Sequence, residues 1–310
     1  MKTSRTFRLA ACLCMLPCIL SVVSGCHRDP IYHLAEKVEV RFNFDLSEED
    51  PAMHVKPKMP SLMQVAFYDV SNYRLALSSP CSSTGGRFAV GPGEYYLVCY
   101  SDNQEYTEVS GQDTFDHLYA FTSTEKMDTD TLGTVIREPD HLLAGRRIPV
   151  KVPFIASEDT TFVIHVDVST IMESYYIQVD SLKGLENISE SDIYLTGHSA
   201  GNYLGYGERS KEERTLHFKG KVDFANKCLC AKFCTFGKLP GVSGGATIRI
   251  VVTGAGGRTY DFHEDITSQY ARKDHILKLV WNEVIKPRSE GGFDPSVEEW
   301  DPEVTDVDVK

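Results

Sequence analysis

The 310-residue sequence lacks any long stretch with the apolar spacing of an amphipathic helix. This absence excludes helical bundles and the alternating strand–helix order of parallel α/β enzymes. Positive charge is also scarce, because 32 Lys and Arg residues stand against 44 Asp and Glu residues and give a formal net charge of −12. An acidic chain does not match the basic surfaces that bind nucleic acid or anionic lipid, so we expect neither of these electrostatic partners.

The usual motifs of catalytic and cofactor sites are missing as well. The ten histidines form no His-Glu-x-x-His pair, and no phosphate-loop lysine follows the glycine-rich segment 254–257. Cys228, Cys230 and Cys234 offer thiolates, but no nearby histidine or fourth cysteine completes a tetrahedral metal site. On a strand they would share one face, like small core residues. We therefore expect no catalytic residue, no metal site and no cofactor, although a carboxylate pair that meets only in the fold, as in a glycosidase, stays open.

One enzyme-like motif is present. Gly197, Ser199 and Gly201 fit the G-x-S-x-G pattern of a nucleophile elbow, in which a strained turn joins a buried strand to a helix. Residues 193–195 would supply the strand, but residues 202–210 contain two glycines and no helical stripe. The pattern therefore predicts a strand that ends in a glycine-rich bend, and not a hydrolase.

What the sequence has in abundance is the two-residue alternation of β-strands. Between 38 and 46 every even position is apolar and most odd positions are polar or charged, which predicts a strand with one buried face. Similar segments recur along the chain: 62–68, 87–90, 94–100, 148–154, 161–168, 175–179, 193–196, 215–218, 222–225, 229–236, 246–252, 258–262 and 275–280. We expect hairpin turns at 91–93 and 254–257, and one short helix at 265–271 capped by Asp265.

These segments predict an all-β fold with two sandwich domains of roughly 130 residues each. Residues 101–147 are polar and irregular, and residues 156–160 are the expected boundary. We place the N-terminal sandwich at 26–156, the C-terminal sandwich at 157–288 and an acidic tail at 289–310. In the tail, Thr305, Val307 and Val309 alternate with their neighbours as in a strand. A lone strand must pair with a sheet edge, within its own molecule, which we favour, or in a neighbouring subunit.

The first 25 residues have the features of a secretory signal peptide. Lys2, Arg5 and Arg8 precede an apolar stretch at 9–23 that is too short to span a bilayer comfortably. Small residues then lead to Cys26, as in the lipobox of bacterial lipoproteins. We expect cleavage before Cys26 and its modification with fatty acids such as palmitate, which tether the mature chain to a membrane. An ordinary cleaved signal or a short transmembrane anchor is the alternative.

Maturation would change the charge and the cysteine inventory. Removal of three positive charges takes the net charge from −12 to −15. Of the nine cysteines, five would keep free thiols or pair with one another: Cys81, Cys99, Cys228, Cys230 and Cys234. An odd number cannot all pair internally, and a domain of this size needs no disulfide framework, so their pairing stays open.

Several segments, in this order, carry a resemblance to a known family. They are Cys26 with the residues after it, 38–44, 91–95, 176–180, 195–201, 233–237 and, as the most specific piece, 291–300. Over its full length the chain resembles the fimbrillin-related lipoproteins of Bacteroidetes, in particular a branch of minor or anchor-like fimbrial subunits.

The resemblance implies two transthyretin-like Greek-key sandwiches and a non-enzymatic structural role in fimbriae or a related adhesive assembly. It implies a lipid anchor in the outer membrane, on the cell surface or on the periplasmic face, and other fimbrial subunits as protein partners. In such families a C-terminal strand of one subunit fills a groove in the next, and stalk subunits lose an N-terminal segment at a basic site. The alternative function is a lipid-anchored module that binds a glycan or host ligand through Trp281, Trp300 and tyrosines.

Overall fold

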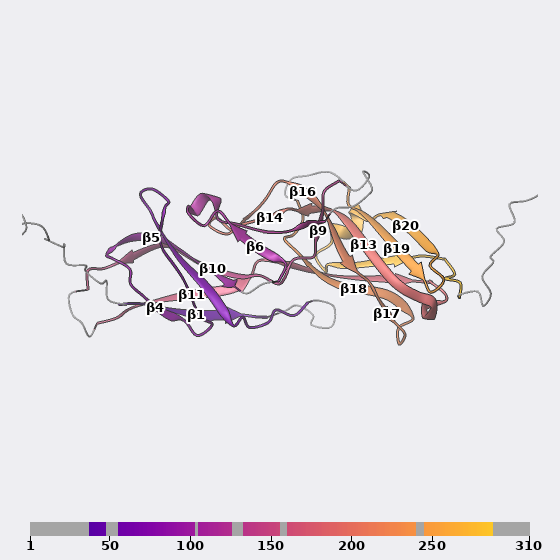
Figure 1. The fold of residues 1–310 in the computed structure, drawn as a ribbon, viewed down its shortest axis with the longest axis horizontal. Helices are drawn as coiled ribbons and strands as arrows, with labels where there is room; N and C mark the ends of the chain where they lie inside the picture. Colours follow the sequence, from indigo (N-terminus) through magenta and orange to yellow (C-terminus); the bar gives the residue numbers. More distant parts are fainter. Residues whose placement is uncertain are drawn as a thin grey trace, which may run out of the picture.

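The computed structural model describes residues 37–47, 55–102, 105–125, 133–155, 160–239 and 245–287. Nearly all of its elements are β-strands, so the predicted all-β fold class is confirmed. The described chain forms two lobes that lie end to end along the long axis of the molecule (Figure 1). Its first residue lies toward the outer end of the N-terminal lobe and its last at the far end of the C-terminal lobe (Figure 1). None of the described helices is long and apolar enough to cross a membrane.

The N-terminal lobe is one seven-stranded sheet that curls around its own core. Across the sheet the strands are β3 (Leu75–Ser82), β2 (Leu62–Asp69), β5 (Gly93–Asp102), β10 (Leu143–Val152), β11 (Phe162–Thr170), β1 (Val38–Asp45) and β4 (Gly86–Phe88). All neighbours are antiparallel except β1 and β11, which run parallel along the whole of β1. The curl brings Phe67 of β2 and Phe88 of β4 together, with ring centroids 6.0 Å apart. The inner positions of β1, Val38 and Val40, are fully buried, as the alternation predicts.

The C-terminal lobe is a sandwich of two sheets. One has four strands: β17 (Lys221–Asp223), β18 (Cys228–Thr235), β12 (Glu173–Asp180) and β21 (Ile276–Val280). The other has six: β20 (Thr259–Asp265), β19 (Thr247–Gly254), β13 (Ile188–Ser199), β16 (Glu213–Lys219), β9 (Val135–Arg137) and β8 (Thr124–Glu125). Phe218 and Phe233 stack across the sandwich with ring centroids 4.0 Å apart. Burial of these apolar faces is the main driving force that holds the two sheets together.

A fourth, antiparallel sheet, which we call the mixed sheet because its strands come from both halves of the chain, joins the lobes. It contains β15 (Glu208–Arg209), β14 (Gly201–Tyr203), β7 (Tyr119–Thr122) and β6 (Thr107–Ser110), so it combines strands from both halves of the chain. A 3-10 turn, η1 (Phe115–His117), precedes β7. Between this sheet and the N-terminal sheet lies a junction core that includes Tyr68, Leu118, Leu204 and Phe236. The segment that looked irregular in the sequence therefore supplies the strands that connect the lobes.

The passage from one lobe to the other lies later in the chain than the predicted boundary at 156/157. That boundary falls between β10 and β11, which are antiparallel neighbours in the N-terminal sheet. Strands β8 and β9 already add to the edge of the C-terminal six-stranded sheet, but the chain then returns to the N-terminal sheet with β10 and β11 and leaves it for the C-terminal sandwich with β12. The alternating pattern of β11 is compatible with either lobe, because periodicity shows which face of a strand is buried but not which sheet the strand joins.

Of the predicted turns and helix, some are present in the structure and one is not. The hairpin at 254–257 is confirmed, since β19 and β20 are antiparallel and the Gly254 N–H donates to the Arg258 carbonyl at 2.8 Å. The hairpin at 91–93 is wrong, because β4 pairs with β1 whereas β5 pairs with β2 and β10. The short helix exists as α2 (Thr267–Tyr270), where the Asp265 carboxylate accepts the Thr267 N–H at 2.8 Å. A second 3-10 turn, η3 (Leu185–Asn187), precedes β13.

Candidate functional site

The residues to which the sequence analysis assigned roles lie outside the described residues: Cys26, Thr305, Val307 and Val309. Trp300 does so too. Trp281 is described, but it is 7% exposed and packs on Phe262 with ring centroids 5.1 Å apart. A buried indole offers no stacking face to a sugar, so a functional surface has to be sought elsewhere in the two lobes.

Ser199 closes β13 and is completely buried. Its hydroxyl lies within hydrogen-bond distance of the carbonyl oxygens of Gly201 (2.9 Å) and Ser210 (2.8 Å). After Ala200 the chain continues into β14, where an elbow would continue into a helix. The predicted strand that ends in a glycine-rich bend is confirmed, and its serine side chain is directed to backbone acceptors.

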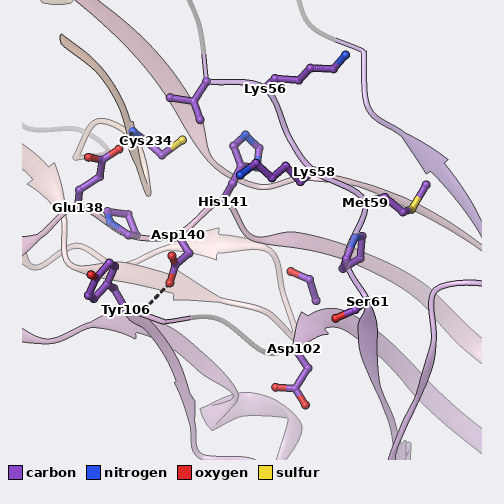
Figure 2. Close-up of a pocket in the computed structure, with 14 residues that line it drawn as sticks. Lys56, Lys58, Met59, Ser61, Asp102, Tyr106, Glu138, Asp140, His141 and Cys234 are labelled. Atoms are coloured by element: carbon purple, nitrogen blue, oxygen red, sulfur yellow. Dashed lines mark hydrogen bonds between the residues drawn. The ribbon is translucent and has the colours of Figure 1, made fainter.

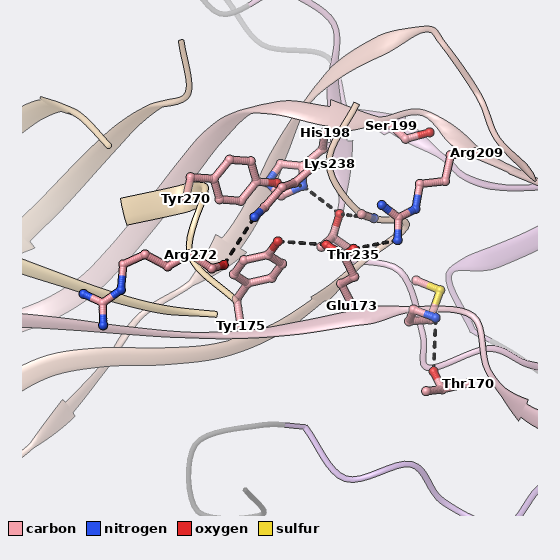
Figure 3. A network of polar contacts seen from close by, with 12 residues as sticks. Thr170, Glu173, Tyr175, His198, Ser199, Arg209, Thr235, Lys238, Tyr270 and Arg272 are labelled. Carbon is pink, nitrogen blue, oxygen red and sulfur yellow. Dashed lines mark hydrogen bonds and ion pairs between the residues drawn. The ribbon is translucent and has the colours of Figure 1, made fainter. Parts of the chain in front are cut away.

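A buried polar network lies beside this serine (Figure 3). Glu173 accepts hydrogen bonds from Arg209 at 2.6 Å and from the Tyr175 hydroxyl at 2.8 Å. Although burial opposes ionisation, the Arg209 charge lowers the pKa of Glu173. His198 lies 2.8 Å from the Tyr270 hydroxyl, and burial lowers its pKa to about 3, so it is neutral. The charged groups of this network satisfy one another, which fits a structural role in fixing β12 and β15 at the junction.

A cavity of about 430 Å³ opens at the junction of the lobes (Figure 2). Glu138 lies on its wall and accepts the Cys234 N–H at 3.0 Å. Burial raises the pKa of Glu138 to about 7, and it lowers the pKa of His141, on the same wall, to about 4. Asp140 accepts the Thr107 N–H at 3.0 Å. The cavity is therefore built around a carboxyl group whose charge is disfavoured by its surroundings.

The three cysteines of β18 share one face, as predicted, but this face is not the sandwich core. Leu229, Ala231 and Phe233 point into the C-terminal core. Cys228 and Cys230 therefore lie on the opposite face of the strand. Cys234 belongs to the junction core, where its thiol is 3.8 Å from the Ser174 hydroxyl. No disulfide joins the cysteines of the described segments.

The N-terminal sheet is closed over only half of β1. β4 pairs with Val38, Glu39 and Val40, and it begins at the tight turn from β3. A Cβ added to Gly85 in this turn would lie 2.1 Å from the Val40 carbonyl oxygen, so the turn crosses directly against β1 at this point. Gly85 has a φ of +113°, a conformation that favours glycine. Beyond the turn, β1 has no described strand on this side.

Among the described residues, the half of β1 beyond Val40 has no strand on the side opposite β11, and its rings are half-buried. The Lys37 carbonyl accepts the Phe162 N–H of β11 at 2.8 Å, so the even-numbered residues of β1 direct their N–H and C=O groups to the other side. Phe42 and Phe44 are such residues, and their rings, 5.9 Å apart, are only partly buried against the N-terminal core. We call Phe42, Phe44 and Leu46 with their backbone the β1 edge. An added strand would pair with it and cover these side chains.

Two other sheet edges in the described segments, those of β21 and β20, are protected. The Gln269 side chain of α2 donates to the Lys278 carbonyl at 2.9 Å and accepts the Lys278 N–H at 2.8 Å, so it occupies the outer edge of β21. β20 carries the exposed charged residues Asp261 and Asp265 on its outer face. Charges and side-chain plugs of this kind oppose pairing with another chain. The β1 edge has two phenylalanines at the corresponding positions.

Comparison with known proteins assigns this chain to a family. Residues 24–219, more than half of the chain, match the family model described as "Domain of unknown function (DUF5119)". The chain belongs to the DUF5119 family.

Relatives of this DUF5119 protein are named as fimbrial and adhesive proteins. A Bacteroides ovatus protein named "Putative fimbrium anchoring subunit Fim4B" is 22% identical over 207 residues, which are 65% of this chain and 58% of that protein, so the match spans less than two thirds of the relative. A Bacteroides ovatus crystal structure described as "a putative adhesin" shares the fold, with a TM-score of 0.60 at 18% identity over 83% of this chain and 97% of the other. A second Bacteroides ovatus structure that is also described as "a putative adhesin" has a TM-score of 0.50 at 12% identity. The match covers 78% of this chain and 88% of the other. The predicted resemblance to the fimbrial family is confirmed.

The buried hydroxyl of Ser199 in this DUF5119 protein allows a direct test of the elbow motif. Ser199→Ala should lower the free energy of unfolding by about 1–3 kcal/mol, because the buried Ser210 carbonyl loses the hydroxyl donor, whereas the Gly201 carbonyl keeps the Ser210 N–H. Ser189→Ala, at the exposed start of the same strand, should change it by less than about 0.5 kcal/mol. Chemical denaturation measures both. Covalent labelling of Ser199 by a fluorophosphonate probe would show that the structural assignment is wrong.

Glu138 should make the stability of the protein depend on pH. Its pKa is about 7 in the folded chain against 4.5 for a free group, so the folded state binds the proton more tightly. The stabilisation that the protonated Glu138 contributes is fully present below pH 4.5. It falls by about 3 kcal/mol as the pH rises through 7. Glu138→Gln should therefore raise the free energy of unfolding at pH 8 and leave it nearly unchanged at pH 4.5. Exposed Glu108→Gln is the control, and an equal gain at both pH values would contradict the assignment.

Proposed function

We propose that this protein is a lipid-anchored, non-enzymatic structural subunit of a fimbria or related adhesive assembly, and that it accepts a strand from a partner subunit at the β1 edge. The observation that carries the proposal is the uncovered half of β1, where backbone donors and acceptors lie next to half-buried Phe42 and Phe44. The fimbrial and adhesive names of its relatives support the same role. The β1 edge has what strand addition requires, because its backbone groups can give affinity through hydrogen bonds and its side chains can give specificity.

The position of the chain ends fits an anchored subunit. Lys37 lies toward the outer end of the N-terminal lobe, and the C-terminal lobe extends away from it (Figure 1). Cys26 is eleven residues earlier, a stretch that spans at most about 40 Å when fully extended. Acyl chains on Cys26 would hold the N-terminal lobe near the outer membrane and direct the C-terminal lobe outward from the cell surface.

The C-terminal tail has a separate place in this proposal. Thr305, Val307 and Val309 would form a strand that pairs with a sheet edge of the same molecule. The described chain ends at Pro287, at the far end of the C-terminal lobe from β1 (Figure 1). A tail that starts there reaches the edges of its own lobe first, whereas the β1 edge remains available to a neighbour.

A charge placed on the β1 edge should block assembly without unfolding the subunit. Phe44→Asp puts a carboxylate where a partner strand would dock, and charged residues on edges prevent pairing. We expect loss of co-purifying fimbrial subunits and of fibres seen by electron microscopy. Val280→Asp is the matched control, since Val280 is a 59% exposed apolar residue on another edge strand. Normal assembly of Phe44→Asp, or equal loss in Val280→Asp, would contradict the proposal.

The lipid anchor has its own test. Cys26→Ala should remove the acceptor of the acyl chains, so the chain should no longer incorporate labelled palmitate or fractionate as a mature membrane lipoprotein. Metabolic labelling and detergent partitioning measure this. Persistent acyl labelling of the variant would rule out Cys26 as the site.

A second function is favoured by an exposed ring cluster beside η1. Tyr73 and Tyr96 stack with ring centroids 5.5 Å apart, and Phe115 lies 4.6 Å from Tyr96. Tyr73 is 38% exposed and Tyr206 is 46% exposed, with the Tyr206 hydroxyl bonded to Asp116. Exposed rings beside a carboxylate suit the apolar faces and hydroxyls of a sugar. If Phe44→Asp leaves assembly intact, binding of a glycan or host ligand at this cluster becomes the leading function.

A further inference from the structure

The hairpin of β17 and β18 brings together one carboxylate and two thiols, which are groups that bind metal ions, on the outer face of the C-terminal lobe. Asp223 ends β17 and pairs in register with Cys228, the first residue of β18. Cys230 follows two positions later and therefore lies on the same face. A carboxylate oxygen of Asp223 and the two Sγ atoms all lie within 4.8 Å of one another. Cys228 is fully buried, whereas Asp223 and Cys230 are partly exposed, so an ion has a route from solvent.

Asp223 is held in place before any ion arrives. Its carboxylate accepts the N–H groups of Ala225 at 3.0 Å and Asn226 at 3.1 Å, in the turn that joins the two strands. Both of these bonds go to Oδ1, and Oδ2 accepts the side-chain amide of Asn226 at 2.7 Å, so one lone pair of Oδ2 is left to bind an ion. The ligand is thus fixed by the same turn that sets the register of the hairpin.

The surroundings of the two thiols favour a cation. The two thiols lie together with the carboxylate of Asp223, so three groups that are or can become anions meet within 4.8 Å of one another. A bound dication would offset these charges, since it stabilises thiolates and carboxylates. Tyr176, 8% exposed, pairs in register with Lys232 of β18 and therefore lies on the same outer face as the two thiols.

We infer that Asp223, Cys228 and Cys230 form a zinc site with a water molecule as fourth ligand. Zinc takes thiolate and carboxylate ligands in a tetrahedral arrangement, and Zn–S bonds of about 2.3 Å place two sulfurs about 3.8 Å apart. Rotation of the two short side chains covers the remaining distance. Two Zn–S bonds form and two S–H bonds break, so two protons leave to solvent as Zn²⁺ binds. The ion ties the two strands at the pair that closes the turn, and the turn carries Phe224, which is 65% exposed.

The test is equilibrium binding of Zn²⁺ to the full chain, reduced with a phosphine and in competition with a chromophoric chelator. One equivalent should bind, more tightly at higher pH because protons are released. Cd²⁺ in place of Zn²⁺ should give the ultraviolet thiolate-to-metal absorption. Cys230→Ser should weaken binding at least about 100-fold and abolish that absorption, and Asp223→Asn, which can keep the turn, should weaken it about tenfold.

Cys234→Ser is the matched control, because Cys234 lies on the same face of the same strand but in the junction core. It should bind Zn²⁺ as the unmodified chain does. The inference is overturned if the unmodified chain binds no stoichiometric Zn²⁺, if Cys234→Ser loses binding as Cys230→Ser does, or if protein isolated from cells carries a Cys228–Cys230 disulfide. Should Cys230→Ser fail to fold, unchanged binding by Asp223→Asn overturns it.

Discussion

The unpaired N–H and C=O groups along the edge of a β-sheet are the constraint on which most of this architecture depends. A chain made almost entirely of strands has to cover these groups or leave them available to another chain. The N-terminal sheet curls until β4 approaches β3, and β4 covers the first half of β1. The edge of β21 is filled by one glutamine side chain from α2. The second half of β1 stands out because none of these devices reaches it in the described chain.

The same constraint explains why the lobes are joined by strands and not by a simple linker. β9 extends the C-terminal six-stranded sheet by parallel pairing with β16, and β7 pairs with β14 in the mixed sheet. Each contact covers an edge of one half of the chain with a strand of the other. The ion pair of Glu173 and Arg209 then lies within the junction, where buried charges are tolerated because they are paired. An assembly force applied to one lobe would therefore be carried to the other by paired backbone.

Sequence periodicity gave the fold class and most of the long strands, because a half-buried strand leaves its two-residue pattern at every position, as in β1 and β19. It could not give the partners of β4 or β11, since the pattern shows a buried face and not a neighbour. The strands β6 to β9 are short and partly polar, so their signal is weak. The β1 edge was invisible for a different reason: β1 looks like any strand, and only the turn at Gly85 shows that its cover stops halfway. The position of Asp223 beside Cys228 was missed for a similar reason, because it depends on the register of the hairpin between β17 and β18.

The parallel pairing of β1 with β11 also sets an order of events during synthesis. Asn43 and Asp167, which share a hydrogen bond of 3.0 Å between these strands, are 124 residues apart in the chain. β1 is made first but cannot take its place until β11 has been made, and pairings over such distances form slowly. During that interval β1 is an extended apolar segment with both edges bare. A nascent chain of this design would depend on a holding factor, or on delayed folding, to avoid premature association.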